Sequence, residues 1–405
     1  MKKLFSSQKA IYISFVVSLI AFFLYSFTQI DLSLTFSRIE FLRNLVKSFQ
    51  YIGYFNRPLS AGIYIFFLII FHLFYFFFLY LASRKKINIK KAWILFFTTA
   101  AVLIFSYNAF SYDLFNYIFD AKIITHYQQN PYIHKALDFP GDPMLSFMRW
   151  THRVYPYGPV WLVLTVPLSF IGMNFFLPTF FLFKLLMAAC YLGTVCFIGK
   201  ILRKISPDKE VWGTIFFALN PLIIIESLVS AHLDIVMIFF AVWSLYQLIN
   251  KKYIGALVLL AISIGIKFAT AALLPIFMVI IFLQLKNKKI NWNIVFFSLL
   301  ILMLGTAIYA SRLSNFQPWY LLEALFIVVF LSDRYAVFIP SVIISFFALL
   351  TYVPFLYLGN WDPPVPQILS NIYMLSYLVS IFTVIGYYFY DRQFKTKISR
   401  CKTKV

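Results

Sequence analysis

The sequence predicts an all-α polytopic membrane protein with about 12 transmembrane helices, on three observations. Hydrophobic residues make up 62% of the 405 and charged residues only 12%, whereas a soluble domain carries about 25% charged residues. A water-soluble core of this size cannot cover so much apolar surface. The apolar residues also fall into successive runs of roughly 20, the length that spans a bilayer as a helix. The net charge of +21 comes from short basic connections between these runs, which is typical of cytoplasmic loops rather than of nucleic-acid binding.

The runs that we expect to form helices follow one another along the chain. They lie near residues 11–30, 61–83, 92–110, 174–199, 211–229, 233–249, 254–267, 268–285, 293–311, 317–331, 335–357 and 370–390. We expect a single integral membrane domain, 1–405, in which 111–156 is a large loop. Within residues 31–60, a mixture of polar and apolar residues predicts an amphipathic helix on the membrane surface.

The distribution of Lys and Arg predicts which side each connection faces. With the N-terminus in the cytoplasm, 24 Lys and Arg residues fall inside, 9 fall outside and two lie within spans. The positive-inside rule then places both termini, including the basic tail 391–405, in the cytoplasm and the 111–156 loop outside the cell membrane. The chain must cross an odd number of times between this loop and the basic residues at 200–209. We therefore interpret 158–172 as an interfacial or re-entrant helix, with a spanning helix as the open alternative, and 174–199 as the span.

The outer loop begins with two carboxylates spaced for one face of a helix. Asp113 and Asp120 are seven residues apart, and Tyr117 lies between them, so that the three side chains share nearly one face. A carboxylate held among aromatic rings at the membrane surface suits a general base for a sugar hydroxyl. In the alternative interpretation, Asp113 caps a surface helix and Asp120 belongs to a solvated face.

The end of the same loop carries bases and aromatic residues in the segment WTHRVYPYGPVWL. His152 and Arg153 precede the turn that leads into the helix near 158–172. A lipid phosphate is a natural partner for this arginine. An aromatic belt at the membrane surface is the alternative explanation for Tyr155 and Trp161.

Further ionisable residues occur where two apolar runs meet. In NPLIIIESLVSAHLDIVM, Glu226, His232 and Asp234 fall at the end of one predicted span and the start of the next, where such residues are costly and usually functional. An interhelical hydrogen-bond cluster is the alternative. His-x-Asp supplies only two ligands, a weak signal for a metal. We expect no cofactor, and a divalent metal stays an open alternative that the sequence does not indicate.

Four more polar residues lie near the predicted outer surface. Lys267, within an apolar run, either extends to the interface or binds an anion there. Arg312 is the only base of the next outer turn, in which Tyr320 lies at the interface, and Glu323 is placed to pair with a buried base. The candidate residues thus converge on one side, where bases could bind a lipid phosphate.

These motifs resemble, in their order and membrane depth, those of the polyprenyl-phosphate-mannose-dependent mannosyltransferases of the GT-C superfamily. The closest likeness is to the bacterial α-(1→6)-mannosyltransferase branch, over roughly residues 95–325. It rests on SYDxxxY with NPY, WxxRxYPYGPxWL, NPLxxxE with HxD, a lysine-containing apolar segment and PWY. Gln128 and Gln129 stand where relatives usually have a glycine, and the chain from Tyr335 onward does not align with the family.

The resemblance implies an inverting transfer of a hexose, with mannose inherited from the likeness, from a polyprenyl-phosphate donor to a lipid or glycan acceptor. The reaction would take place outside the cytoplasmic membrane among membrane lipids. The resemblance gives Asp113 the role of catalytic base. It carries binding roles to Tyr117, Asn130, Tyr132, Tyr155, His232 and Asp234. Our interpretation adds Asp120 as a second catalytic carboxylate, and as further binding residues His152, Arg153, Glu226, Lys267, Arg312 and Tyr320.

Two other functions stay open at this level. A carrier for a lipid-linked sugar usually shows repeated halves, which this sequence lacks. A lipid-linked glycan polymerase or ligase would act at the same surface without the early aspartate. A purely structural membrane protein does not explain why carboxylates and bases collect on one side.

Overall fold

The computed structural model describes residues 2–34, 38–332 and 334–402, and side chains from residue 8 to residue 391 within them. All regular secondary structure in these described ranges is helical. The long helices are α1 (Lys2–Ser26), α3 (Arg57–Ser83), α4 (Ile89–Leu103), α7 (Phe176–Ile205), α10 (Asp234–Ile249), α11 (Tyr253–Ile266), α13 (Trp292–Ser314), α15 (Tyr335–Leu350) and α17 (Val365–Lys402). The shorter helices are α2 (Glu40–Gln50), α5 (Asp113–Thr125), α6 (Pro159–Ile171), α8 (Glu210–Ala218), α9 (Pro221–Ile224), α12 (Leu274–Leu285), α14 (Leu322–Val328) and α16 (Tyr352–Leu358). Tighter or wider turns extend several of them, namely η6 (Ile225–Val229), η7 (Phe268–Leu273), η8 (Pro318–Leu321) and η9 (Val329–Leu331).

Seven helical segments of the described chain are long and apolar enough to cross a membrane. They are Gln8–Gln29, Arg57–Ser83, Phe176–Ile205, Phe268–Leu285, Trp292–Ser314, Tyr335–Leu358 and Val365–Asp391. An eighth consists of Pro207–Ala218 and Pro221–Val229, which meet at a bend of 54°. The other four expected runs form shorter helices, three of which are apolar helices of 10–17 residues and the fourth the 15-residue α4. The protein is therefore a multi-pass helical membrane protein.

The two expected surface elements are helical as well. The connection between α1 and α3 contains α2, whose side chains are mostly exposed. The segment predicted at 158–172 is α6, with 13 residues. At 1.5 Å per residue it is about 20 Å long, shorter than the roughly 30 Å hydrocarbon core. It packs against α5, α7 and α11.

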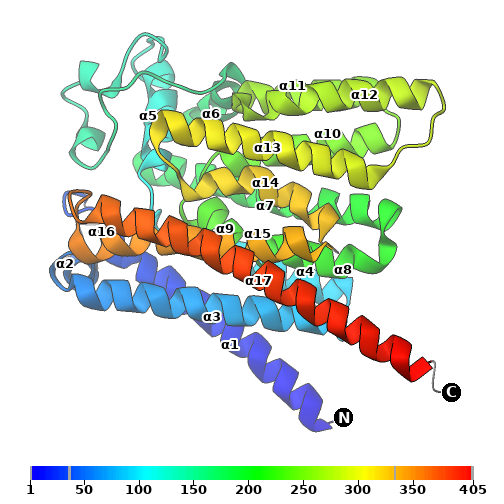
Figure 1. The fold of residues 1–405 in the computed structure, drawn as a ribbon. Helices are drawn as coiled ribbons and strands as arrows, with labels where there is room; N and C mark the ends of the chain where they lie inside the picture. Colours follow the sequence, from blue (N-terminus) through cyan, green and yellow to red (C-terminus); the bar gives the residue numbers. More distant parts are fainter. Residues whose placement is uncertain (1, 35–37, 333, 403–405) are drawn as a thin grey trace.

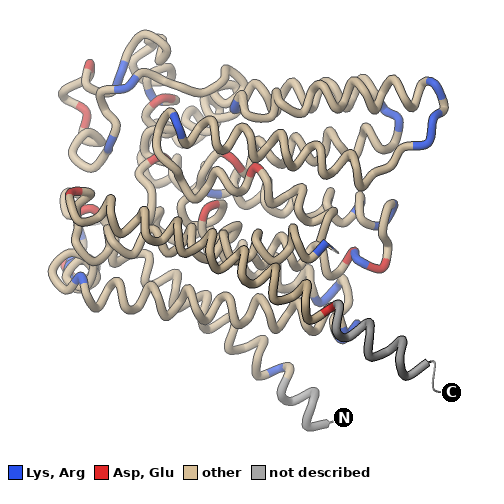
Figure 2. Tube along the Cα trace, in the orientation of Figure 1, with Lys and Arg blue, Asp and Glu red and all other residues tan. Residues whose placement is uncertain are grey.

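The long helices run side by side, and α5 crosses one end of the bundle (Figure 1). Both termini lie at the opposite end, where Lys and Arg residues also gather (Figure 2). Residues 403–405 of the expected basic tail lie outside the described residues, as do the side chains from 392 onward. The basic connections and the termini thus share one end, and the first residues of α5 lie at the other.

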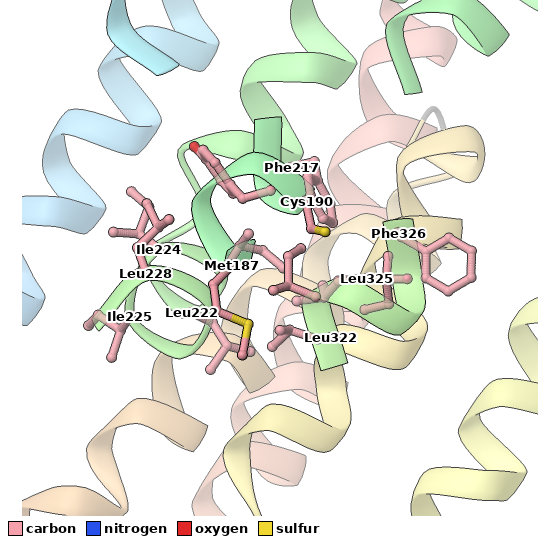
Figure 3. Close-up of a cluster of buried hydrophobic side chains, with 14 of the residues drawn as sticks. Met187, Cys190, Phe217, Leu222, Ile224, Ile225, Leu228, Leu322, Leu325 and Phe326 are labelled. Carbon is pink, nitrogen blue, oxygen red and sulfur yellow. The ribbon is translucent and has the colours of Figure 1, made fainter. Parts of the chain in front are cut away.

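Apolar side chains from the middle of the sequence and from α14 meet in the centre of the bundle. Figure 3 shows this cluster, in which α7 contributes Met187 and Cys190. Facing them are side chains of the bent span and of α14, namely Phe217, Leu222, Ile224, Ile225, Leu228, Leu322, Leu325 and Phe326. Each of these residues is 5% exposed or less. The cluster fixes the bent span against α7 and α14, which matters because the bend carries polar residues of the site.

The start of α6 makes a very close backbone contact with the end of α11. The Gly158 amide donates a hydrogen bond to the Ile266 carbonyl oxygen at 3.1 Å. A Cβ atom at Gly158 would lie 2.1 Å from the Gly265 carbonyl oxygen, so only glycine allows this approach. The contact positions Lys267, the residue directly after α11.

We expect Gly158→Ala to lower the apparent melting temperature of the detergent-solubilised protein. The added methyl group must push two backbones apart, and overpacking of this kind costs about 1–3 kcal/mol. Gly62→Ala is the matched control, since nothing lies within 4 Å of a Cβ atom at Gly62 in α3 and alanine favours a helix. Equal melting temperatures for the two variants would contradict the close-contact explanation.

Candidate active site

The first residue of α5 is held by a serine that precedes it. The Asn108 side chain donates a hydrogen bond to the Ser111 carbonyl oxygen at 2.8 Å. The Ser111 hydroxyl oxygen in turn accepts a hydrogen bond from the Asp113 amide at 3.1 Å, which satisfies one of the free amides at a helix start. Asp113 therefore lies in the first turn of α5, where the helix dipole stabilises a negative charge.

The bent span brings His232 to this helix start. After η6, a π-helical turn of a type that often occurs at functional sites, Ala231 adopts a left-handed backbone with φ of 58°. The buried Lys184 of α7 donates hydrogen bonds to the Leu228 and Val229 carbonyl oxygens. These carbonyls would otherwise be unpaired at the break, so Lys184 stabilises the turn that directs His232 toward α5.

His232 lies at the centre of a chain of polar groups. Its Nδ1 atom is 2.9 Å from Oε2 of Glu226, and its Nε2 atom is 3.0 Å from the Ser111 hydroxyl and 3.7 Å from Oδ2 of Asp113. The Trp319 ring stacks on the imidazole, with centroids 3.9 Å apart and planes inclined by 22°. The chain continues beyond Glu226, whose Oε1 atom accepts a hydrogen bond from the Tyr352 hydroxyl at 2.9 Å.

A second buried charge cluster lies beside the first. Lys267 Nζ is 2.6 Å from Asp234 Oδ1 and 2.8 Å from Glu323 Oε1. It also lies over the ring of Tyr320, 5.0 Å from the centroid. The expected pairing of Glu323 with a base is confirmed. The sequence suggested that Lys267 could bind an anion. In the structure its charge is already paired with two carboxylates.

Exposure distinguishes Asp113 from the enclosed residues of its own cluster, Glu226 and His232. Its side chain is 16% exposed, whereas those of Glu226 and His232 are 0% exposed. Burial raises the pKa of Asp113, while the charges of His232, Lys267 and Arg153 oppose this rise. Glu226 and His232 were expected to bind substrate, but in this structure they are enclosed and contact other protein groups. Within this series of hydrogen-bonded polar groups, Asp113 is the member that is accessible from outside the protein.

Asp120 lies two turns further along α5 in a different setting. No described residue donates a hydrogen bond to its carboxyl group, and burial raises its pKa to about 8. Asp120 is therefore mostly protonated at pH 7, and a protonated carboxyl group donates a hydrogen bond but does not accept a proton. On the same helix the buried Tyr117 contacts the rings of Tyr157 and Trp161, each with centroids 5.4 Å apart.

The predicted binding residues of the loop have mainly local contacts. Asn130 accepts a hydrogen bond from the Tyr132 amide at 3.0 Å. The Tyr132 hydroxyl donates to the Tyr157 carbonyl at 3.1 Å. The buried Tyr155 donates to the Gly158 carbonyl at 2.7 Å. These three residues shape the loop over α5.

The bases at the end of the bundle that carries α5 are more exposed. The Arg153 guanidinium lies over the Trp150 ring, 4.4 Å from its centroid, and His152 beside it is exposed. Arg312 is exposed near the end of α13, two residues before Ser314, whose hydroxyl bonds to that of Tyr320 at 2.7 Å. Among the described residues no carboxylate forms a salt bridge with Arg153 or Arg312, so both charges are free for an anion.

The structure adds residues that the sequence did not single out. Ser111 precedes the expected base, and serine before a helix is a readable capping signal. Lys184 is a charge within an apolar span, a signal of function to which we had assigned no role. Tyr352 carries no sequence signal, because it is one of 27 tyrosines in a segment without family likeness.

The sequence matches a known protein family. A family model described as α-(1→6)-mannopyranosyltransferase, N-terminal domain, matches residues 39–284, which is more than half of the chain. Searches of curated proteins and of solved structures return no match. The matched range contains Asp113, His232 and Lys267, so it covers both buried charge clusters in part. The chain is a multi-pass membrane glycosyltransferase that belongs to the α-(1→6)-mannopyranosyltransferase family.

Proposed function

We propose that this mannosyltransferase uses a polyprenyl-phosphate-linked mannose donor and a hydroxyl of a lipid or glycan acceptor, with Asp113 as general base. The observation that carries the proposal is that Asp113 is partly exposed while the other carboxyl groups of the two clusters are enclosed. Asp113 is 16% exposed, while the side chains of Asp234 and Glu323 are 2% and 1% exposed. A general base must lie within hydrogen-bond reach of the proton that it accepts.

The proposed reaction forms one bond and breaks one. The acceptor oxygen attacks the anomeric carbon on the face opposite the phosphate, and the bond between that carbon and the phosphate oxygen breaks. Asp113 takes the proton of the attacking hydroxyl. The polyprenyl phosphate leaves as an anion, and the configuration at the anomeric carbon is inverted.

The leaving phosphate needs positive charge more than it needs an acid. Arg153 and Arg312 are the bases that support this role, because both are exposed and free of salt bridges within the described part of the chain. Arg153 is also near enough to Asp113 for its charge to oppose the rise of the aspartate pKa. Lys267, expected for the same role, instead holds Asp234 and Glu323 together and supports the wall of the site.

We propose that the site faces the outside of the cytoplasmic membrane. The bias of Lys and Arg supports this side, since basic residues gather at the end of the bundle that holds the termini (Figure 2) and the positive-inside rule assigns such an end to the cytoplasm. About 12 crossings would follow if the four shorter helices also cross. The candidate base Asp113 lies at one end of the bundle and not at its middle. This arrangement favours a transferase at a membrane surface over a carrier with a midplane site.

We expect Asp113→Asn to lose nearly all mannosyl transfer, because the amide cannot accept a proton. A general base contributes about 10²–10⁴ in rate. Transfer of label from radiolabelled polyprenyl-phosphate mannose to an acceptor pool, measured with the purified variant, checks this. Equal transfer by the variant and the wild type would refute the role of Asp113, provided that both show the same melting temperature.

Asp120→Asn provides a matched control on the same helix. Asparagine closely resembles a protonated aspartate, which is the form that a pKa of about 8 favours at pH 7. We expect this variant to retain most of its transfer rate at pH 7 in the same assay. A loss as large as that of Asp113→Asn would make Asp120 an essential carboxylate, as the sequence first suggested.

The dependence of transfer on pH follows from the ionisation of Asp113. A base works only when deprotonated, so the rate should fall as the pH falls through the pKa of Asp113. Burial raises that pKa, and the midpoint of the acid limb should therefore lie above the value of about 3.9 for a free aspartate. A rate that stays constant down to pH 4 would contradict this prediction.

A further inference from the structure

The chain of polar groups behind Asp113 ends on Tyr352, a residue that the proposed reaction does not use. Tyr352 is the first residue of α16 and lies outside the range that matches the family model, 39–284. Its hydroxyl donates a hydrogen bond of 2.9 Å to Oε1 of Glu226. A tyrosine donor so placed stabilises the ionised form of the carboxylate, since only that form accepts through both oxygens.

Glu226 has few other ways to remain ionised. The side chain is 0% exposed, and an enclosed carboxylate is costly unless it is paired and hydrogen-bonded. The Tyr352 hydroxyl donates a hydrogen bond to Oε1 of Glu226, and Nδ1 of His232 lies 2.9 Å from its Oε2. The ring of Tyr64 from α3 also lies near, and the charge of Glu226 acts on its hydroxyl. Without the Tyr352 hydroxyl, the carboxylate depends on His232 alone.

The position of one proton between His232 and Glu226 decides the charge next to Asp113. With the proton on the imidazole, His232 is a cation between two carboxylates, 2.9 Å from Glu226 and 3.7 Å from Asp113. The stacked Trp319 ring, 3.9 Å away, favours this cation further. With the proton on Glu226 instead, both partners are neutral and Asp113 loses its nearest positive charge.

Other charged and titratable groups face Asp113 from the neighbouring elements. From α10 comes Asp234, from the end of α11 Lys267, and from the loop Arg153. The hydroxyls of Tyr117 and Tyr157 also lie near Asp113, within range of its charge. Lys267 is already paired with two carboxylates, and Arg153 is exposed, so His232 is the enclosed cation whose charge can change.

We propose that Tyr352 is a positioning residue for the transfer reaction, which keeps Glu226 ionised, His232 positively charged and Asp113 therefore ionised and ready to accept a proton. The inference rests on the proposed role of Asp113 as base. It assigns part of the catalytic apparatus to the C-terminal helices. Trp319 and Tyr352 both come from beyond residue 284, so the matched domain alone does not contain the complete site.

The test compares two tyrosine-to-phenylalanine variants of the full-length protein. Tyr352→Phe removes the hydrogen bond to Glu226. Tyr191→Phe is the matched control, because this buried tyrosine donates a similar bond of 2.7 Å to the Ala218 carbonyl away from the network. We expect Tyr352→Phe to move the acid limb of the transfer rate by about one pH unit to higher pH, equal to about a tenfold loss below the midpoint. The control should keep the wild-type profile.

Repeating the Tyr352→Phe change in the Glu226→Gln variant separates this role from a general loss of stability. Glu226→Gln removes the carboxylate through which Tyr352 acts, so this variant should shift the acid limb in the same direction. Tyr352→Phe added to Glu226→Gln should then cause no further shift, since the two changes act through one group. Equal additional shifts in both backgrounds, or an unchanged profile of Tyr352→Phe, would overturn the proposal.

A measurement without donor or acceptor keeps the inference distinct from the proposed function. The ionisation of Asp113 can be followed as the infrared carboxyl signal that disappears in Asp113→Asn, during a pH titration of the detergent-solubilised protein. Its midpoint should lie at higher pH in Tyr352→Phe than in the wild type and in Tyr191→Phe. An unchanged midpoint refutes the role of Tyr352. A shifted midpoint in a protein that transfers no mannose would support it and refute the donor instead.

Discussion

The pairing of buried charges is the interaction on which the rest of this structure depends. Ionisable side chains within a membrane protein are costly unless another group compensates each charge. Here Glu226 and His232 compensate one another, and Lys267 is matched by Asp234 and Glu323. The two clusters come from helices that are far apart in sequence, so their pairing also holds the bundle end together. The same pairing leaves Asp113 as the partly exposed carboxylate of the two clusters.

Irregular helix geometry makes this pairing possible. A regular span would carry residues 226 and 232 along one continuous spiral, whereas the π-helical turn and the left-handed Ala231 turn the chain back toward α5. The break frees backbone carbonyls, and Lys184 satisfies two of them. The close contact at Gly158 also positions a charged residue, because it brings the end of α11, and with it Lys267, to the site. Local departures from regular structure are thus placed where the polar side chains are needed.

The site draws on more of the chain than the part that identifies the family. The matched range supplies the proposed base Asp113, the histidine and the lysine. Trp319, Glu323 and Tyr352 come from the C-terminal helices and contact His232, Lys267 and Glu226. These contacts add a stacking ring, a carboxylate and a hydroxyl to polar groups that the matched range supplies. The C-terminal helices therefore contribute to the candidate active site and are not only additional membrane anchors.

The sequence alone determined the fold class, because hydropathy and helix length are local properties that a lipid solvent selects. It also identified Asp113, His232, Asp234 and Lys267 as candidates, since charges are conspicuous in apolar runs. It did not show which charges pair. The tertiary structure decided that Lys267 is held by two carboxylates, that Glu226 and His232 are enclosed, and that Tyr352 joins them. The contacts of Lys267 join residues 33 and 56 apart, and that of Tyr352 joins residues 126 apart. No periodicity along one segment records such contacts.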